Sequence, residues 1–521
     1  MTWLKWAGPK RLAVSLTALL IAAPTHVLAE APVPDSQTIA AKIIETNGAP
    51  PARFRETLET VNEHGEHTIR TVYRDGSDAR SVSDSGPFHE ENGTLHGQAW
   101  RQNANGQTIL RQPDPGDERH VLPTTTVTRI TEPVVGYVVA RLDEHGEGTK
   151  DYVDASTWRI VRQDGVTANG TSATTYDDFR SDGGRVFTHH WRTVNGINHT
   201  TTDTTVTAYV PGGVTAADLA IPPPARALVE FPPGVTSVTL PTHFSDRPFN
   251  GERINVRLTI AGRGLDFVLD TGASGILMDS TVARQLGLHL YQQQSAVTAA
   301  RYESAEAVVP EIHVGDLVMH NVAVHVAPLG FDNGNVKEVG LLGFDFLAEL
   351  GVTIDYDQKR VTVVPGDAFV PPTAPNAIAV PVRVGDGEQE VTLTFNGAVG
   401  ERWGLDTGVR GTFMVFGHFA TRYPDAVRQD RVVPRYARYG VGSGVGGSFD
   451  AERLHVRSVV LGNVTFTDVI GTLVTQSGAY DAPMDGVIGA AFLHFFTVEL
   501  DDTHSTVYFI PNEAGKRAGL K

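Results

Sequence analysis

Short apolar stretches separated by polar turns make up most of this chain of 521 residues. In many of them apolar and polar residues alternate or β-branched residues are frequent, as in His67–Tyr73, Val134–Ala140 and Ile254–Ile260. Alternation with a period of two places one face of a strand in a core and the other in water. The pattern therefore predicts a mainly β protein built from antiparallel strands.

Two segments carry helical signals instead. Ser36–Glu45 is predicted to be a short helix with Ser36 as its N-cap and Gly48 just past its end. Ser280–Leu286 is predicted to be another, with Ser280 as its N-cap. Serine suits this position because its side-chain oxygen accepts a hydrogen bond from a free backbone N–H of the first turn.

One apolar pattern occurs twice and ends in an acid each time. Phe267–Leu269 leads directly into an Asp-Thr-Gly sequence that begins at Asp270, and Trp403–Leu405 leads into a second that begins at Asp406. Such a short apolar run is typical of a buried strand that ends in a turn. A carboxylate at the end of a buried strand costs free energy, so its repetition indicates a function.

Each acid is followed at long range by a second shared pattern. Gly340–Gly343 and Gly486–Gly489 align without a gap, at an offset of 489 − 343 = 146 residues. The same offset places Asp355 on Asp501. The two acids are 406 − 270 = 136 residues apart, so the second copy has ten extra residues between its two patterns. The chain therefore contains an internal repeat of one β-rich unit.

The paired motifs resemble those of aspartic peptidases, specifically the bacterial retropepsin-like and pepsin-like group. The resemblance covers roughly residues 250–512 and implies a mainly β, bilobed domain whose lobes face each other across a pseudo-two-fold axis. It also implies that Thr271 and Thr407 bridge to the opposite loop and that the apolar-apolar-Gly segments lie under the loops. An antiparallel β-rich (α+β) domain is expected before this bilobed domain.

The chemistry of two adjacent carboxyls can be argued without the family. Two carboxyls a few ångströms apart share one proton, so their apparent pKa values split. The ionised partner can take a proton from water while the protonated partner polarises a peptide carbonyl. We therefore expect an aspartic endopeptidase with Asp270 and Asp406 as its catalytic residues and with no metal or other cofactor. Both acids lie in one chain, so a dimer is not required.

The residues after the two acids differ. Gly272 and Gly408 are expected to allow the tight turn and close backbone approach. Ser274 is expected to hydrogen-bond the outer oxygen of Asp270, whereas Arg410 stands at the equivalent place in the second copy. If Arg410 pairs with Asp406, it hinders proton sharing; if it points outward, it matters little. The alternative to a peptidase is a non-catalytic peptide- or lipid-binding envelope protein with a degenerate peptidase fold.

Each repeat has a candidate substrate flap. In the first, a hairpin is expected between residues 296 and 309, and Tyr302 is its only aromatic residue. In the second, the glycine-rich stretch Tyr439–Gly447 is the candidate, with Tyr439 closing on substrate. This stretch also matches a dinucleotide-binding pattern. That interpretation fails because the next segment, Leu454–Leu461, is predicted to be a strand and not a helix.

The N-terminus and the composition indicate export. Residues 1–29 have the form of a secretory signal peptide, with an apolar segment, Leu12–Ala23, too short to span a bilayer. Removing Lys5, Lys10 and Arg11 changes the net charge from −17 to −20, which argues against nucleic acid as a partner. With no cysteine, the chain has no disulfide. We expect a periplasmic or secreted protein that acts on peptide or protein substrates and has no stable membrane insertion after signal cleavage.

The order of these segments predicts a domain organisation. The N-terminal domain resembles, by pattern alone, the curved-sheet domains of periplasmic lipoprotein carriers; an accessory domain or a pro-region that shields the cleft are the other interpretations. The expected segments are a signal peptide (1–29), a β-rich N-terminal domain (30–210), a Pro-rich linker (211–248), peptidase lobe one (249–368), an inter-lobe linker (369–375) and peptidase lobe two (376–521).

Overall fold

The structure, a computed structural model, describes most of the chain after the expected signal peptide. The described residues are 32–111, 123–143, 146–167, 170–245, 253–297, 301–329, 337–385, 387–428, 439–445, 447–476 and 484–520. The signal-peptide prediction for residues 1–29 lies outside this set. In the described part, no helix has the length and apolar character needed to cross a membrane.

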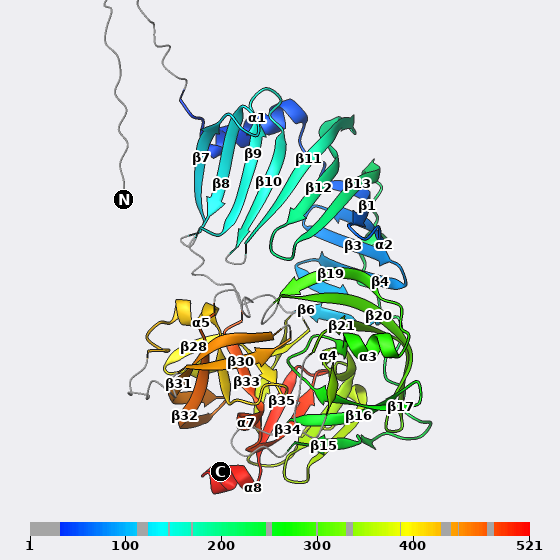
Figure 1. Cartoon of the computed structure of the whole chain (residues 1–521), viewed down its shortest axis with the longest axis vertical. Coiled ribbons are helices and arrows are strands. Elements are labelled where there is room, and N and C mark those ends of the chain that lie inside the picture. Colours follow the sequence, from blue (N-terminus) through cyan, green and yellow to red (C-terminus); the bar gives the residue numbers. More distant parts are fainter. Residues whose placement is uncertain are drawn as a thin grey trace, which may run out of the picture.

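The N-terminal part of the chain forms one antiparallel sheet. Thirteen strands of the described residues belong to it, in the order β6-β5-β4-β3-β2-β1-β13-β12-β11-β10-β9-β8-β7. They are β1 (Arg53–Asn62), β2 (His67–Asp75), β3 (Asp78–Ser85), β4 (Phe88–Leu95), β5 (Gln98–Gln102), β6 (Thr108–Arg111), β7 (Thr124–Ile130), β8 (Gly136–Leu142), β9 (Gly148–Asp154), β10 (Ile160–Thr167), β11 (Gly170–Asp182), β12 (Arg185–Asn195) and β13 (Thr200–Pro211). The first and last strands pair with each other in the middle of the sheet (Figure 1).

Helix α1 (Ser36–Asn47) covers part of this sheet. Its Ile39 is buried with Val139 and Val153 of the sheet. The prediction of Ser36 as N-cap is wrong. Asp35 caps the helix, because its carboxylate accepts a hydrogen bond from the backbone N–H of Thr38 at 2.7 Å.

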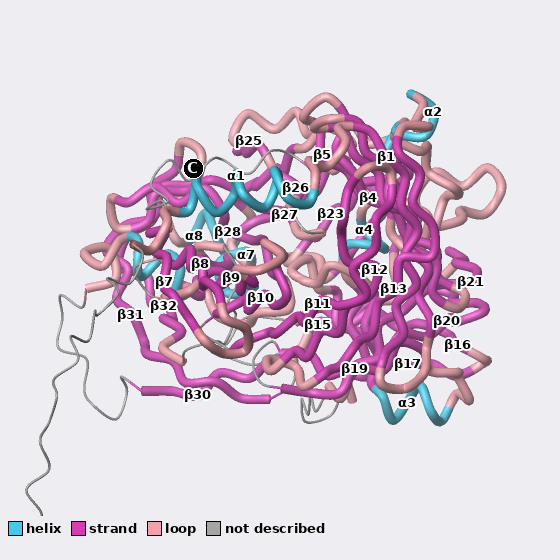
Figure 2. Tube along the Cα trace, turned by 90° about the horizontal axis from the view of Figure 1, so that it is seen from above, coloured by secondary structure: helices cyan, strands magenta, loops and turns pink. Residues whose placement is uncertain are grey.

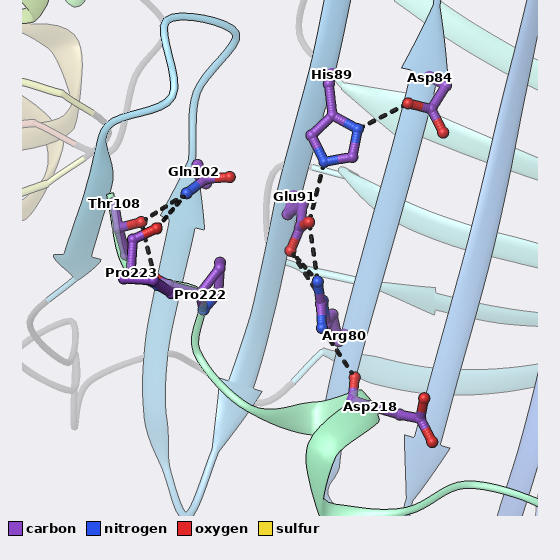
Figure 3. A network of polar contacts seen from close by, with 9 residues as sticks. All are labelled: Arg80, Asp84, His89, Glu91, Gln102, Thr108, Asp218, Pro222 and Pro223. Atoms are coloured by element: carbon purple, nitrogen blue, oxygen red, sulfur yellow. Dashed lines mark hydrogen bonds and ion pairs between the residues drawn. The ribbon is translucent and has the colours of Figure 1, made fainter. Parts of the chain in front are cut away.

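The Pro-rich segment after β13 is fastened to the sheet rather than free. Gln102 and Thr108 donate side-chain hydrogen bonds to the carbonyls of Pro223 and Pro222, each at 2.9 Å (Figure 3). Figure 3 also shows Arg80 reaching the carbonyl of Asp218, in the short helix α2 (Ala216–Leu219). The segment therefore follows the sheet edge and leads the chain to the second half of the molecule.

The second half contains two sheets of the same design. Lobe one has the order β15-β16-β17-β22-β18-β21-β20-β19, and lobe two has the order β26-β27-β28-β33-β29-β32-β31-β30. The strands of lobe one are β15 (Thr242–Phe244), β16 (Ile254–Ile260), β17 (Arg263–Leu269), β18 (Ile276–Asp279), β19 (Tyr291–Val297), β20 (Arg301–Val314), β21 (Leu317–Ala327) and β22 (Glu338–Leu342). Those of lobe two are β26 (Arg383–Val384), β27 (Gln389–Phe395), β28 (Ala398–Asp406), β29 (Phe413–Val415), β30 (Tyr439–Gly444), β31 (Gly447–Leu461), β32 (Val464–Val474) and β33 (Gly486–Gly489).

Equivalent turns support the correspondence between the lobes. Ala261 and Gly262 join β16 to β17, and Asn396 and Gly397 join β27 to β28. All four residues have positive φ, between 48° and 89°, which matches the twist of a two-residue hairpin. The strand prediction for Leu454–Leu461 is confirmed, because this segment belongs to β31.

A third sheet joins the lobes at their base. It contains strands from both halves in the order β14-β24-β23-β34-β35-β25, and β23 pairs with β34 across the two lobes. These strands are β14 (Val238–Thr239), β23 (Leu350–Asp355), β24 (Arg360–Pro365), β25 (Ile378–Pro381), β34 (Phe496–Asp501) and β35 (Thr506–Pro511). The prediction of a mainly β, two-lobed fold preceded by a β-rich region is confirmed.

Short helices lie around these sheets, and strands make up most of the trace in Figure 2. In α3 (Ser280–Gln285) the N-cap is Asp279 and not the predicted Ser280, because the Asp279 carboxylate accepts from the N–H groups of Thr281 and Val282. The others are α4 (Phe344–Leu347), η1 (Gly366–Ala368), α5 (Gly417–Arg422), α7 (Ala490–Leu493) and α8 (Glu513–Arg517).

The N-terminal sheet is anchored in lobe one by the hairpin β5–β6. Asn103 and Asn105, both buried, donate to the two carboxylate oxygens of Asp345 at 2.8 and 3.0 Å. Gln107 donates to the Asp345 carbonyl at 2.8 Å, and Ile109 packs against Phe344 in a small apolar cluster. Asp345 lies just after the Gly340–Gly343 segment, which supports the first Asp-Thr-Gly loop. The hairpin therefore contacts the chain next to this supporting segment.

Candidate active site

The two acids stand at equivalent ends of equivalent strands. Asp270 follows β17 directly, and Asp406 is the last residue of β28. Each of these strands has a parallel neighbour that carries the apolar-apolar-Gly segment, β22 in lobe one and β33 in lobe two. These strands fix the starting direction of both loops.

Reciprocal hydrogen bonds hold the two loops together. The hydroxyl of Thr271 donates to the carbonyl of Leu405 at 2.5 Å, and the hydroxyl of Thr407 donates to the carbonyl of Leu269 at 2.6 Å. Each hydroxyl also accepts from the backbone N–H of the opposite threonine at 3.1 Å. Both threonines are buried. The bridging that the resemblance implied for these two residues is thus present.

The glycines of the motifs bring each loop against the opposite acid. A Cβ added to Gly272 would lie 2.6 Å from Cγ of Asp406, and one added to Gly408 would lie 2.5 Å from Oδ2 of Asp270. A real Cβ cannot approach this closely, so only glycine fits at either position. The two carboxyls are close enough for the charge of Asp406 to act on Asp270.

Burial raises the pKa of both acids. For Asp270 the pKa lies well above its ordinary value, first because of burial and then because of the neighbouring charge of Asp406. Burial also raises the pKa of Asp406, but the backbone N–H of Val409 donates to its Oδ1 at 2.8 Å and opposes the rise. Because both carboxyls resist ionisation, the pair is expected to share one proton.

The cation that acts on both acids is Arg253. Its positive charge lowers the pKa of Asp270 and of Asp406. Arg253 donates to the carbonyl of Gly408 at 2.9 Å and pairs with the fully buried carboxylate of Glu338 at 2.6 Å. The sequence did not single out this residue.

Arg410 lies beside the same buried carboxylate. Its guanidinium is 4.0 Å from Oε1 of Glu338 and 3.3 Å from the hydroxyl of Ser245. Arg253 and Arg410 thus both lie beside the carboxylate of Glu338. Glu338 was also missed by the sequence, although it begins β22 just before the apolar-apolar-Gly segment.

A third carboxyl faces the pair from lobe two. Burial, followed by the charges of Asp406 and Glu390, raises the pKa of Glu388 to about 8. Arg402 opposes this rise. Glu388 is therefore protonated near neutral pH and adds no charge to the site. It precedes β27 directly, a position that the sequence pattern did not mark.

The other predicted site residues lie outside this pair. Ser274 makes no side-chain hydrogen bond to Asp270 among the described residues, and its side chain lines a cavity that faces the N-terminal sheet. The expected hydrogen bond to Asp270 is therefore absent from the described residues, and a Cβ added to Gly387 would lie 3.0 Å from the Ser274 Cβ. Tyr302 lies near the start of β20, in the hairpin predicted as a flap. Tyr439 begins β30, and its side chain lies outside the described part.

Among the described residues, no group of three or more His, Cys, Asp or Glu residues has the arrangement of a metal site. His325 hydrogen-bonds Glu306 at 2.6 Å, and His320 lies 3.6 Å from Glu311. Both histidines therefore have a carboxylate neighbour.

Comparison with known proteins agrees with this geometry. Residues 256–346, which include Asp270 and the first apolar-apolar-Gly segment, match the aspartyl protease family model. No curated protein sequence matches the chain. The match supports an aspartyl protease domain in lobe one.

Solved structures give weak likenesses. Basic 7S globulin from soybean aligns with a TM-score of 0.32 and 13% identity over 54% of this chain and 97% of that chain. A LolA superfamily protein from Nitrosomonas europaea aligns with a TM-score of 0.28 and 11% identity over 36% of this chain and 97% of that chain. Neither score reaches 0.5, so no statement on function rests on them.

Proposed function

We propose that this protein is an aspartic endopeptidase in which Asp270 and Asp406 are the catalytic residues. The observation that carries the proposal is the reciprocal bonding of Thr271 and Thr407, which holds the two loops together so that each acid lies against the glycine of the opposite loop. The family match of lobe one supports the same reaction class. Thr271, Gly272, Thr407 and Gly408 position the acids, and peptides or proteins are the proposed substrates.

In the proposed mechanism Asp406 starts ionised and Asp270 starts protonated. Asp406, the ionised partner, takes a proton from a water molecule whose oxygen attacks the carbonyl carbon of the peptide bond. Asp270, the protonated partner, gives its proton to the carbonyl oxygen and yields a tetrahedral diol. Asp406 then gives its new proton to the leaving nitrogen, Asp270 takes one back from the diol, and the C–N bond breaks. The pair ends in its starting state.

The experiment that tests the function is cleavage of an unstructured protein by the mature chain. Fragments are read by mass spectrometry from pH 4 to 7.5 for the wild type, Asp270→Asn and Asp406→Asn. We expect a loss of at least about 10²–10⁴-fold in either variant, because each removes half of an acid–base pair. Asp316→Asn, an exposed turn residue, is the matched control and keeps the wild-type rate.

The result also separates the peptidase from its alternative. Fragments that persist in both dyad variants contradict the assignment of Asp270 and Asp406. If the wild type produces no fragment at any pH, a binding protein with a degenerate peptidase fold is the better interpretation.

We also propose that the protein is exported to the periplasm or the exterior after removal of residues 1–29. The charged start and the short apolar segment Leu12–Ala23 support this. N-terminal sequencing of the protein from the periplasmic and external fractions is expected to begin at Glu30. A full-length chain retained in the cytoplasm would contradict export.

A further inference from the structure

A polar cavity of about 190 Å³ lies where the N-terminal sheet meets lobe one. The N-terminal sheet contributes Glu90 from β4 and Arg101 from β5. Lobe one contributes Ser274, Gln292 and His325. A cavity volume of about 10–15 Å³ is enough to hold one water molecule, so this cavity has room for part of a ligand.

Two separate stretches of chain lead from residues at the cavity towards the two acids. Ser274 is four residues after Asp270. On the side of lobe two, an added Cβ on Gly387 would lie 2.5 Å from Nη2 of Arg101 and 3.0 Å from Cβ of Ser274. The next residue, Glu388, feels the charge of Asp406. Two residues that line the cavity, Arg101 and Ser274, therefore lie beside the chain segments that carry Glu388 and Asp270.

The two charged residues from the N-terminal sheet have no polar partner. Among the described residues, neither the Glu90 carboxylate nor the Arg101 guanidinium makes a hydrogen bond or an ion pair, and Nε of Arg101 is buried without a partner. The two charges still influence each other, because Arg101 lowers the pKa of Glu90. They thus face the same space but lie too far apart to pair directly.

The remaining charges around the cavity are already satisfied. His325 pairs with Glu306 at 2.6 Å, and Asp345 accepts hydrogen bonds from Asn103 and Asn105. Nε of Arg101 is buried without a partner, whereas Glu90 is exposed, so a ligand that bonds both groups satisfies Arg101 and adds a contact to Glu90. Such a ligand needs both a donor and an acceptor.

The charge pattern also limits what can enter. A basic side chain would face Arg101, and an acidic side chain would face Glu90 and Glu306. An amide has an N–H group for Glu90 and a carbonyl oxygen for Arg101, and it carries no net charge. Backbone conformation agrees with a site under constraint, because Gln292 in the cavity wall has a φ of 49°.

We propose that this cavity is a substrate subsite that the N-terminal domain shares with lobe one, and that Glu90 and Arg101 select an uncharged amide side chain, Asn or Gln, of the bound peptide. The inference rests on the proposed peptidase function, because the ligand is taken to be the substrate of the Asp270–Asp406 pair. The N-terminal domain then determines specificity.

The test is a specificity profile of the full mature chain. A random peptide library is digested by the wild type, Glu90→Gln and Arg101→Gln, and residue frequencies around the cut are read by mass spectrometry. At one position the wild type should favour Asn and Gln. At that position Glu90→Gln should admit acidic residues about two- to fivefold more often, and Arg101→Gln should do the same for basic residues, as removal of one repulsive charge predicts.

The controls separate this proposal from others. Arg70→Gln and Glu311→Gln make the same chemical changes at exposed sites and should leave the profile unchanged. If Arg101→Gln does not fold, Glu90→Gln alone decides the question. An unchanged profile in a folded Glu90→Gln variant overturns the subsite. If the wild type cleaves nothing, the peptidase proposal fails, and enrichment of library peptides on the immobilised proteins then tests the subsite by itself: Asn- and Gln-rich peptides must be retained by the wild type and less by both variants.

Discussion

The two lobes share one design but present different groups to the catalytic pair. The residue directly before β16 in lobe one is Arg253, and the residue directly before the equivalent β27 in lobe two is Glu388. Arg253 lowers the pKa of both aspartates, whereas Glu388 is held protonated near neutral pH with a pKa of about 8. A symmetric backbone thus carries an asymmetric electrostatic field, which is what a pair that shares one proton requires.

The helices after the apolar-apolar-Gly segments differ in the same sense. Asp345 in α4 corresponds to Ala491 in α7 at the offset of 146 residues. The Asp345 carboxylate accepts hydrogen bonds from the side chains of Asn103 and Asn105 in the N-terminal sheet, and an alanine side chain has no acceptor. The N-terminal sheet is therefore attached to one lobe through the support of its catalytic loop. The difference teaches that repeated folding units acquire separate roles through a few polar substitutions.

Among substitutions that test this difference between the lobes, the largest effect on stability is expected from Asp345→Asn. The amide presents an N–H group where a carboxylate oxygen accepts, so a buried side chain from the hairpin β5–β6 loses its partner. We expect the free energy of unfolding to fall by about 3 kcal/mol, because the lost bond involves a charged group. Thermal unfolding checks this, with a decrease of several °C.

Asp316→Asn is the matched control for that change. It lies on the surface, and we expect a change within about 0.5 kcal/mol. Equal melting temperatures for the two variants would mean that the hairpin contributes little to the stability of lobe one.

A smaller effect is expected from Glu388→Gln as the pH rises. The folded pKa of about 8 lies above the ordinary value of 4.5, so the folded state binds the proton more tightly than the unfolded state. Its contribution to stability is complete below about pH 4.5 and is lost as the pH rises to about 8.

Glutamine cannot ionise, so Glu388→Gln should lose less stability than the wild type between pH 6 and 8. We expect a difference of about 1 kcal/mol, below the limit of about 1.4 kcal/mol per pH unit because Glu388 is partly exposed. Urea unfolding at several pH values measures it. Asp502, whose pKa is raised to about 7, still ionises in the variant. The stability of the variant therefore still falls as the pH rises, but less steeply than that of the wild type. Parallel curves for the variant and the wild type would contradict the assignment.

The smallest effect is expected from the two arginines beside Glu338. Arg253→Gln removes the charge that lowers the pKa of both aspartates, so the acid limb of the pH–activity profile should move to higher pH. At acidic pH the rate should fall by less than about tenfold, which is under about 1.4 kcal/mol. Arg253→Lys keeps the charge and should retain the profile. Arg410→Gln should move the limb less than Arg253→Gln does, and the opposite order would show that Arg410 is the main cation of the site.

The sequence alone was sufficient for the pair of acids and for the repeat around them. The pattern of three apolar residues before Asp270, its second copy at Asp406 and the two aligned downstream segments carried that prediction. It could not reveal Arg253 or Glu338, because charged residues at strand ends are common and only the folded chain brings them under the loops. The N-caps were displaced by one residue for a similar reason, since Asp35 and Asp279 stand beside serines of nearly equal capping preference.

The role of the N-terminal region was harder to predict. Its strands follow from alternation, but side-chain amides such as Asn103 and Asn105 have no periodic signal and are as frequent in surface turns. Their burial against Asp345 depends on a partner 240 residues away in the sequence. A pro-region that leaves the peptidase on cleavage is one of the three interpretations of this region given by the sequence. The buried bonds to lobe one favour a domain that stays attached.

The order of strands in the N-terminal sheet has a geometric consequence. Its two edges are β6 and β7, which are consecutive in the sequence and run from Arg111 to Thr124. Thirteen flat strands spaced about 4.8 Å apart would separate these edges by about 58 Å. The 13 residue steps between them reach at most about 47 Å. The sheet must therefore curve, and this curvature gives the domain a concave face.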